Sequence, residues 1–384
     1  MKELQYSTPL QDKSLVGTIA MVTRNPKSLG QRHKYALISD ASWKCFGYKA
    51  CISPQSTGGF GLPAFASLSQ VDCDGLADGD VVKFNEHSLT VLWEHGGRDN
   101  ALMLTESCNC RCLMCPQPTK PHDVTLITEA HTILDLLKGQ SIPTICLTGG
   151  EPTLVKNDFI NILKRCVMEH PEAEISVLSN GKTFADMDFA KQVGNVVKAA
   201  HAKVLFCISL HSDIDEINDT IVGAKGSRNA TENGIYNLAQ SGVPVEIRHV
   251  ITKMNFVRLA NFAEYVYSYF PFCCHYAFMG MEVHGDAEKN KEVIYAAPSE
   301  YKEELRQAVL TLYHRGLPVS IYNIPLCMCH EDVRIFATQS ISQWKNNFHE
   351  KCDGCMVQES CAGFFTTSAI LPVQDINPIR RPLL

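Results

Sequence analysis

The sequence predicts an α/β protein in which a partial barrel of parallel strands and helices lies between a β-rich N-terminal region and a cysteine-rich C-terminal segment. Three observations lead to this prediction. Short alternating apolar runs fill the first 97 residues, apolar strands alternate with amphipathic helices from about residue 99, and nine of the 17 cysteines lie in two short windows. The predicted domains are residues 1–97, 98–324 and 325–384.

Composition excludes several classes of protein. A chain of 384 residues that is 45% hydrophobic and 20% charged can bury a large core. The first 14 residues have no apolar segment typical of a signal peptide, and no later window resembles a membrane span. We therefore expect a soluble cytoplasmic protein without a membrane partner, in which clustered cysteines bind metal and do not form a disulfide framework. The net charge of -6 gives no general attraction to nucleic acid, so we do not expect a nucleic-acid partner.

The N-terminal region, residues 1–97, has the pattern of an all-β domain. Its apolar runs are short and are separated by Gly, Pro, Asp and Asn, which favour turns. The runs are VGTIAMV, KYALIS, DVVKF and SLTVLW. This pattern predicts a small barrel or sandwich.

From about residue 99 the pattern changes to strand, turn and amphipathic helix, repeated. The predicted strands are ALMLTES, TICLTGG, EISVLSNG, VLFCISLHS, VPVEIRHVI and HYAFMGMEV, with VSIYN as a seventh. Strands that alternate with helices of this length imply parallel β/α units with right-handed crossovers. The helices should cover the outside of the barrel, and functional groups should lie at the carboxyl ends of the strands.

The segment CNCRCLMCPQP, residues 108–118, follows the first of these strands. Cys108, Cys112 and Cys115 have CxxxCxxC spacing, and three thiolates from one loop can bind three irons of a cubane cluster while the fourth iron stays open. In this respect the chain resembles the radical SAM superfamily. The resemblance implies that these cysteines hold a [4Fe-4S] cluster whose open iron binds S-adenosylmethionine (SAM). We interpret Cys110 as a bystander, and structural zinc is the alternative use of the loop.

A second match lies at the end of the second strand, in LTGGEPTL. It resembles the GGEP motif of the superfamily, which receives the methionine ammonium of SAM. Gly149 and Gly150 would let the backbone approach the ligand, and Glu151 would supply the charge complement. By the same resemblance, the backbone of Met114 would face adenine.

Further polar residues stand at the expected strand ends, and we predict that they also contact SAM. They are Ser179, Asn180, Ser209 and Arg248. Arg248 suits the SAM carboxylate or ribose. The alternative is that each is an ordinary strand-end group that satisfies turn backbone. We assign no catalytic residue, and we treat the histidines near the strand ends as structural.

The C-terminal cysteine group offers ligands for a second site. It resembles the SPASM and twitch auxiliary-cluster domains, although it lacks the full SPASM spacing. The resemblance implies one auxiliary [4Fe-4S] cluster, with Cys329 as a competitor for the first position and zinc as the alternative metal. The predicted ligands are Cys327, Cys352, Cys355 and Cys361.

A narrower resemblance is to HxsC, the radical SAM maturase family of the His-Xaa-Ser system. It rests on NIPLC, QSISQWKNNF before CDGC, CAGFF, and ISLHSDIDEIND before IVGAKGS. It implies reductive SAM cleavage to a 5'-deoxyadenosyl radical that modifies a ribosomally made His-Xaa-Ser peptide, together with a sister radical SAM protein. An electron donor such as flavodoxin or ferredoxin is also implied. The alternatives are modification of RNA or a small metabolite, and a non-catalytic zinc-binding interaction protein.

Overall fold

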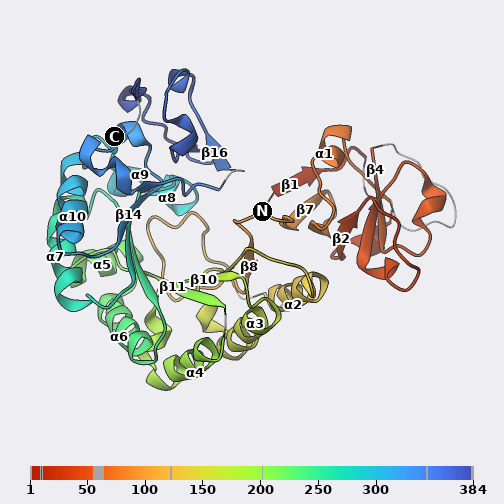
Figure 1. Cartoon of the computed structure of the whole chain (residues 1–384), viewed down its shortest axis with the longest axis horizontal. Helices are drawn as coiled ribbons and strands as arrows, with labels where there is room; N and C mark the ends of the chain where they lie inside the picture. Colours follow the sequence, from red (N-terminus) through yellow and green to blue (C-terminus); the bar gives the residue numbers. More distant parts are fainter. Residues whose placement is uncertain are drawn as a thin grey trace.

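The computed structural model describes residues 2–8, 10, 12–54, 65–121, 123–200, 202–342 and 345–381. Two of the sequence positions used above, 343 and 344 in QSISQWKNNF, lie outside these ranges. The chain forms a large crescent-shaped lobe and a smaller lobe beside it (Figure 1). Among the described helices, none is long and apolar enough to cross a membrane.

The large lobe is built on a sheet of parallel strands in the order β15-β14-β13-β12-β11-β10-β9-β8. The strands are β8 (Ala101–Met103), β9 (Thr144–Thr148), β10 (Glu174–Ser179), β11 (Lys203–Ser209), β12 (Val245–Val250), β13 (His275–Met279), β14 (Val319–Tyr322) and β15 (Ala337–Thr338). The six predicted strands and the seventh are therefore confirmed. β8 and β15 are the two edges, so the barrel is open on one side.

Helices cover the outer face of this sheet, as the amphipathic patterns predicted (Figure 1). They are α2 (Thr125–Leu137), α3 (Lys156–Glu169), α4 (Met187–Lys198), α6 (Ser227–Gln240), α7 (Leu259–Tyr269) and α10 (Lys302–His314). In α3, for example, Phe159, Ile162 and Cys166 are buried at helical spacing. Three further helices were not predicted: α5 (Asp215–Val222), α8 (Asp286–Lys289) and α9 (Lys291–Ile294).

The small lobe contains one seven-stranded sheet in the order β1-β7-β6-β2-β3-β4-β5. The strands are β1 (Lys2–Gln5), β2 (Ile19–Thr23), β3 (Tyr35–Ile38), β4 (Ala50–Ser53), β5 (Phe65–Ser67), β6 (Val81–Phe84) and β7 (Ser88–Trp93), with helix α1 (Gln70–Asp74) before β6. The β-rich prediction is confirmed. The predicted barrel or sandwich stays a prediction, and the amide of Ser7, just after β1, donates to the carbonyl of Ser67 on β5 at 2.8 Å, which links the two edge strands of the sheet. β2 to β5 run parallel to one another, so the connections that join them are longer than hairpin turns.

The two lobes share apolar and polar contacts at α2. Met21 and Trp93 of the small lobe belong to the same buried cluster as Leu134 of α2. Lys83 on β6 forms an ion pair with Glu129 on α2. These contacts fix the N-terminal sheet to the first helix of the barrel.

The small lobe also contains a disulfide between Cys45 and Cys51, whose Cα atoms lie 6.0 Å apart. This distance is normal for a disulfide. The sequence analysis did not foresee this pair, which lies outside the two cysteine-rich windows. The other cysteines of the described ranges are free.

After β14 the chain forms short 3₁₀ turns and a two-stranded hairpin of β16 (Asn346–Asn347) and β17 (Phe364–Phe365). β15 precedes this hairpin and pairs with β14 of the barrel. The C-terminal segment therefore contributes one strand to the barrel sheet, and the proposed boundary at residue 325 stays a prediction.

Candidate active site

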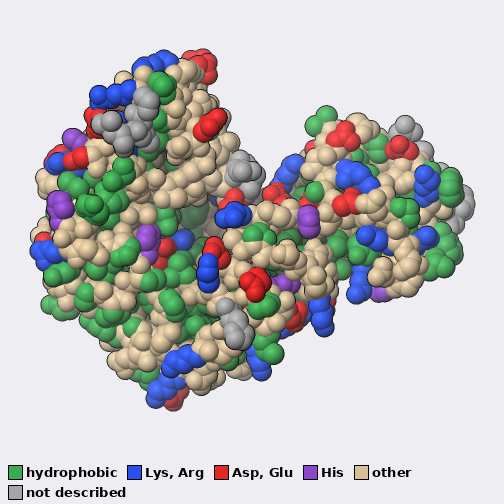
Figure 2. Space-filling view, in the orientation of Figure 1, with side chains coloured by type: hydrophobic (Ala, Val, Ile, Leu, Met, Phe, Trp, Pro, Cys, Tyr) green, Lys and Arg blue, Asp and Glu red, His purple; other side chains and the backbone are tan. Residues whose placement is uncertain are grey.

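A cavity of about 1010 Å³ lies at the carboxyl ends of the barrel strands. Its wall includes the last residue of successive strands, namely Thr148, Ser179, Ser209, Val250, Met279, Tyr322 and Thr338. The loop after β8 completes the wall and crosses the inside of the crescent (Figure 1). On the face drawn in Figure 2, basic and acidic side chains are interspersed around this region. The cavity therefore has the location that a parallel β/α sheet predicts for a functional site.

Cys108, Cys112 and Cys115 all line this cavity. Helix α5 holds their loop, because the amide groups of Arg111 and Leu113 donate to the last residues of the helix, at 2.9 and 2.8 Å. On the other side, the amide of Asp286 donates to the carbonyl of Cys115 at 2.9 Å. The sequence analysis missed α5, although Gly223 in the left-handed conformation marks its end.

The donor set of this loop fits an iron–sulfur cluster, because cysteine thiolates are the usual cluster ligands and three of them face one cavity. Burial raises the pKa of Cys115, whose thiol donates to the carbonyl of Gln117 at 2.8 Å. Within the described ranges, no three His, Cys, Asp or Glu side chains already converge around one point. Cluster binding by this loop therefore stays a prediction.

Cys110 lies in the middle of the same loop and also lines the cavity. Its thiol accepts hydrogen bonds from Cys108 and Cys112, which lower its pKa and raise theirs. The side chains of Asn180 and Lys182 each place a nitrogen 3.7 Å from its sulfur. The sequence interpretation of Cys110 as a bystander did not foresee this central position.

Gly149 and Gly150 line the cavity, as expected, but the structure adds a second reason for glycine. A Cβ on Gly149 or Gly150 would collide with the carbonyl of Thr105 or Ser107. The amides of Gly150 and Glu151 donate to these two carbonyls at 2.7 and 2.8 Å. Both glycines therefore allow the loop after β9 to pack directly against the start of the cysteine loop.

Glu151 lies behind the wall of the cavity, and its contact with SAM stays a prediction. Its side chain is fully buried and is absent from the described cavity wall. One carboxylate oxygen accepts from the hydroxyls of Ser179 and Thr153 at 2.8 and 2.5 Å, and from the Thr153 amide at 3.1 Å. The other accepts from the Asn180 amide at 2.7 Å. Burial raises its pKa, which these hydrogen bonds partly offset. The carboxylate therefore holds the turn after β10.

Ser179 and Asn180 line the cavity and link it to the cysteine loop. The side-chain nitrogen of Asn180, Nδ2, donates to the side-chain oxygen of Asn109 at 2.6 Å and lies 3.8 Å from the sulfur of Cys108. The Ser179 hydroxyl accepts from the Gly181 amide at 3.0 Å. The geometry is compatible with a structural role, because these residues bind turn backbone, and also with a contact to SAM, because they face the cavity.

The remaining predicted SAM contacts also lie on the wall. Met114 and Ser209 line the cavity, and Met114 is 8% exposed because it packs in an apolar cluster with Ile221 of α5. Arg248 enters the cavity from β12. Ligand contact by these residues stays a prediction.

Comparison with known families now adds to this geometry. Residues 102–266 match the model of the radical SAM superfamily. This segment is a radical SAM domain. It contains the cysteine loop, the GGEP segment and Arg248. Proteins of this superfamily use a [4Fe-4S] cluster and SAM, which agrees with the predicted cofactors of the first site.

Two curated relatives resemble the radical SAM domain over part of the chain. Fe-coproporphyrin III synthase of Methanosarcina barkeri is 28% identical over 158 residues, which is 40% of this chain and 36% of that protein. The sporulation killing factor maturation protein SkfB of Bacillus subtilis is 26% identical over 168 residues, 42% of this chain and 38% of SkfB. The chain thus matches less than half of the length of either relative.

A solved structure with similarity to this chain is that of Streptococcus suis SuiB bound to SAM. It superposes with a TM-score of 0.47 at 14% sequence identity. The superposition covers 58% of this chain and 49% of SuiB.

Beside the radical SAM domain, the C-terminal segment forms a second, small cavity lined by cysteines. The four predicted auxiliary ligands, Cys327, Cys352, Cys355 and Cys361, all line it. Phe348 and Phe364 are among the apolar side chains that close it. The structure therefore brings together thiols that are up to 34 residues apart in the sequence.

Cys329 lies outside the described wall of this cavity. It is fully buried in the main core of the barrel, and burial raises its pKa to about 12. Cys327 faces the small cavity from the same 3₁₀ turn. Of the two competing cysteines, Cys327 therefore has the position of a ligand.

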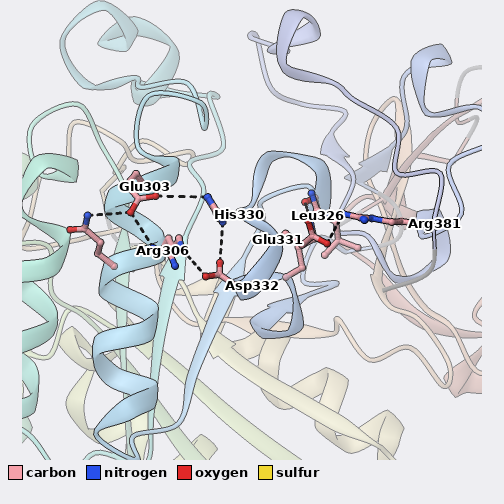
Figure 3. A network of polar contacts seen from close by, with 9 residues as sticks. Glu303, Arg306, Leu326, His330, Glu331, Asp332 and Arg381 are labelled. Atoms are coloured by element: carbon pink, nitrogen blue, oxygen red, sulfur yellow. Dashed lines mark hydrogen bonds and ion pairs between the residues drawn. The ribbon is translucent and has the colours of Figure 1, made fainter. Parts of the chain in front are cut away.

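A polar network fixes the segment that carries Cys327 (Figure 3). Arg306 of α10 pairs with Asp332 at 2.6 Å, and His330 bridges Asp332 and Glu303 of the same helix. On the other side, Arg381 pairs with Glu331 at 2.6 Å. The segment is thus held between α10 and the end of the described chain. Exposed pairs of this kind contribute little stability individually, so their effect is chiefly to orient the segment.

The two cavities share a wall in strand β17. Phe364 lines the small cavity, whereas its neighbour Phe365 lines the large one. This arrangement follows from the alternation of side chains along a strand. Strand β17 therefore separates the two cavities at this point.

Proposed function

We propose that this protein is a radical SAM enzyme that modifies a ribosomally made peptide of the His-Xaa-Ser type. The observation that carries the proposal is the pair of cysteine-lined cavities on either side of β17. A single metal site would suffice for SAM cleavage, whereas a second site next to the substrate cavity suits a reaction in which a substrate radical must be held and oxidised.

In this proposal the loop after β8 holds the first cluster through Cys108, Cys112 and Cys115. When bound, the cluster and SAM supply a 5'-deoxyadenosyl radical that removes a hydrogen atom from the substrate. The backbone of Gly149 and Gly150 receives SAM from the wall of the cavity. The barrel excludes water and directs one C–H bond of the substrate toward SAM.

The C-terminal segment holds the auxiliary cluster in the same proposal. Its ligands are Cys327, Cys352, Cys355 and Cys361. All four are thiols, which suits an iron–sulfur cluster as well as zinc. When bound, this cluster would supply an electron acceptor for the substrate radical, and the four thiols would hold it beside β17. A donor such as flavodoxin or ferredoxin would supply the electron that the first site needs.

Peptide substrates are supported by the resemblance to the HxsC family and by the similarity to SkfB, a protein named for maturation of the sporulation killing factor. We expect the sister radical SAM protein of that system as a partner. A small-molecule substrate is the second candidate, because other relatives are named Fe-coproporphyrin III synthase and GTP 3',8-cyclase.

The test starts with anaerobically reconstituted protein. It should bind about eight irons per chain, and it should release 5'-deoxyadenosine from SAM with a strong reductant. Cys115→Ala should abolish this release. Cys355→Ala should keep it and lose conversion of a His-Xaa-Ser peptide, as followed by mass spectrometry.

The control is that Cys355→Ala retains the iron of the first site and a monodisperse elution profile, since a lost metal site can also unfold a small segment. A folded Cys355→Ala protein that converts the peptide at the wild-type rate would contradict the proposed role of the second site. Zinc at both sites would instead support the non-catalytic interaction protein, and turnover of a small molecule alone would support the second candidate.

A further inference from the structure

The small lobe carries a group of large apolar side chains that are exposed. Leu29, Trp43 and Phe46 are 69%, 72% and 68% exposed, although side chains of this kind are usually buried. Trp43 lies in the 3₁₀ turn Ser42–Cys45 and Phe46 follows it, and residues three apart lie on one side of such a turn. A Cβ on Gly47 would lie 3.9 Å from Leu29, so the loop that carries Leu29 runs beside this turn.

The backbone that carries these three anchors is fixed by specific contacts. Nη1 of Arg32 donates to the carbonyl of Phe46 at 2.7 Å, and the guanidinium carbon lies 5.0 Å from the ring centroid of Tyr48. The disulfide joins Cys45, at the end of the turn, to Cys51 of β4. Because the loops are already held in place, a partner would bind them with little loss of backbone entropy.

Basic residues outnumber acidic ones around the anchors. Residues 24–49 contain six Lys or Arg residues and one acidic residue, although the whole chain has a net charge of -6. Figure 2 shows Lys and Arg side chains beside hydrophobic ones on the small lobe. Five of the six cations take no part in the ion pairs of the described small lobe. Together with the three anchors they define the anchor patch, and they are Lys27, Arg32, Lys34, Lys44 and Lys49.

The sixth cation and the acidic residue lie toward α1. Arg24 pairs with Asp78 and donates to the carbonyl of Cys73 in α1 at 2.6 Å. Burial raises the pKa of Cys73 to about 11, and the charge of Asp40 adds to this effect, which places Asp40 near the same residue. Neither charge therefore neutralises the cations of the anchor patch.

The size and shape of the anchor patch indicate what it can bind. An aromatic side chain presents about 150–250 Å² of surface, so the three anchors expose on the order of 400 Å² together. This is the size of an apolar patch with a binding role, and none of its residues is among those that line the described cavities. Anchors that project in this way need a matching pocket on a folded partner, whereas a lipid bilayer accepts projecting side chains of any shape.

Two other occupants fit less well. Nucleic acid would stack its bases on free aromatic rings, but Lys44 lies over the Trp43 ring and Lys27 over the Tyr35 ring, at 5.5 and 4.9 Å. A symmetric dimer through this surface would bring two basic patches together, and like charges repel. Trp, Phe and Leu beside lysines are instead the residue types of proteins that bind the surface of anionic membranes.

We propose that the anchor patch docks this protein on an anionic lipid surface. Leu29, Trp43 and Phe46 enter the boundary between headgroups and acyl chains, while the lysines bind lipid phosphates. The sequence analysis expected no membrane partner because it considered continuous apolar windows and the charge of the whole chain, whereas this patch is assembled from two loops. Docking would leave both cysteine-lined cavities open to their ligands, and it does not depend on the proposed function.

The first experiment measures binding of the full-length, reconstituted protein to vesicles by flotation, without SAM or peptide. The vesicles contain phosphatidylcholine alone or phosphatidylcholine with phosphatidylglycerol. Wild-type protein should prefer the anionic vesicles by roughly tenfold or more. Trp43→Ala and Phe46→Ala should each weaken this binding by roughly tenfold, because one large inserted side chain is lost. Val71→Ala is the matched control, since Val71 on α1 is 80% exposed and lies outside the patch.

The second experiment separates insertion from general attraction. Lys44→Gln and Lys49→Gln should each weaken vesicle binding by roughly fivefold at low salt, and this difference should shrink as the salt concentration rises. Lys164→Gln, at an exposed position of α3, should have no effect. Lipids with brominated acyl chains should quench the fluorescence of wild-type protein, and Trp43→Phe should remove this quenching while it still binds.

Every variant must keep the wild-type circular dichroism spectrum, and Leu29→Ser replaces any anchor variant that does not fold. The proposal is overturned if wild-type protein does not bind anionic vesicles, or if folded anchor variants bind them like wild type. It is also overturned if Trp43 is required for binding transfer RNA or a polyglutamate peptide, or for self-association in sedimentation velocity, while vesicle binding does not require it. Loss of peptide conversion would contradict only the proposed function, because vesicle binding is measured without turnover.

Discussion

Replacement of Glu151 separates two explanations of the GGEP segment. The sequence motif predicts a carboxylate that contacts SAM, whereas the structure shows a buried carboxylate that accepts four hydrogen bonds from the protein. If the structural explanation is right, the main effect of a substitution is a loss of stability around residues 179–181. A change in SAM affinity then follows from the displaced turn.

The size of the expected loss of stability follows from the hydrogen-bond donors that lose their acceptor. In Glu151→Ala, the backbone N–H groups of Thr153 and Asn180 are left buried without an acceptor. The hydroxyls of Thr153 and Ser179 can rotate toward other acceptors nearby. Each orphaned donor costs about 1–3 kcal/mol, so the unfolding free energy should fall by about 2–6 kcal/mol. Glu151→Gln keeps one acceptor oxygen, and its side-chain NH2 group faces only the backbone N–H of Asn180. The unfolding free energy should therefore fall by about 1–3 kcal/mol.

The assay is urea denaturation followed by circular dichroism under anaerobic conditions, together with SAM affinity from equilibrium dialysis. The exposed residue Glu172 provides a matched control, and Glu172→Gln should change the unfolding free energy by less than about 0.5 kcal/mol. The reasoning is refuted if Glu151→Gln unfolds like wild-type protein while its SAM affinity falls tenfold or more. That result would mean that the carboxylate contacts SAM.

Two further predictions concern metal content and pH. Cys327→Ser should lower the iron content by about half, because it removes one ligand of one of the two cubanes. Cys329→Ser should leave about eight irons per chain and weaken only the packing of the core. Equal iron losses in the two variants, measured by metal analysis, would contradict this assignment. Burial raises the pKa of Glu246 on β12, but the hydrogen bond from His275 and the charge of Arg248 outweigh it and lower that folded-state pKa to about 2. Its stabilising effect is therefore present above the ordinary carboxyl value of 4.5 and is lost as the pH falls toward 2. The difference in unfolding free energy between wild type and Glu246→Gln should therefore shrink between pH 5 and pH 3, and a constant difference would argue against an ionised Glu246.

The sequence alone determined the barrel and the location of the cysteine loop. Alternating strand and helix patterns are local properties, and the carboxyl ends of parallel strands must meet at one edge of the sheet. For that reason Cys108, Gly149, Ser179 and Arg248 could be expected around one cavity before any coordinates were known. The spacing of the cysteines also predicted the class of cofactor, because this spacing is a property of one short stretch of chain.

Tertiary structure decided what the side chains at these positions touch. Glu151 turns into the protein because Ser179 and Asn180 from another strand offer it donors. Spacing in the sequence does not distinguish Cys327 from Cys329. In the structure they lie on opposite sides of one 3₁₀ turn, so Cys327 lines the small cavity and Cys329 is buried in the barrel core.

The same limit applies to the long-range pairings of the chain. The parallel order of β2 to β5, the addition of β15 to the barrel and the disulfide of Cys45 and Cys51 depend on contacts between separate segments. So does the hydrogen-bonded chain that runs from Arg248 through Glu246 and His275 to Ser320 and joins three strands. Periodicity shows which residues face inward on one element, but the partner that a buried polar group finds is set by elements that fold against it from elsewhere in the chain.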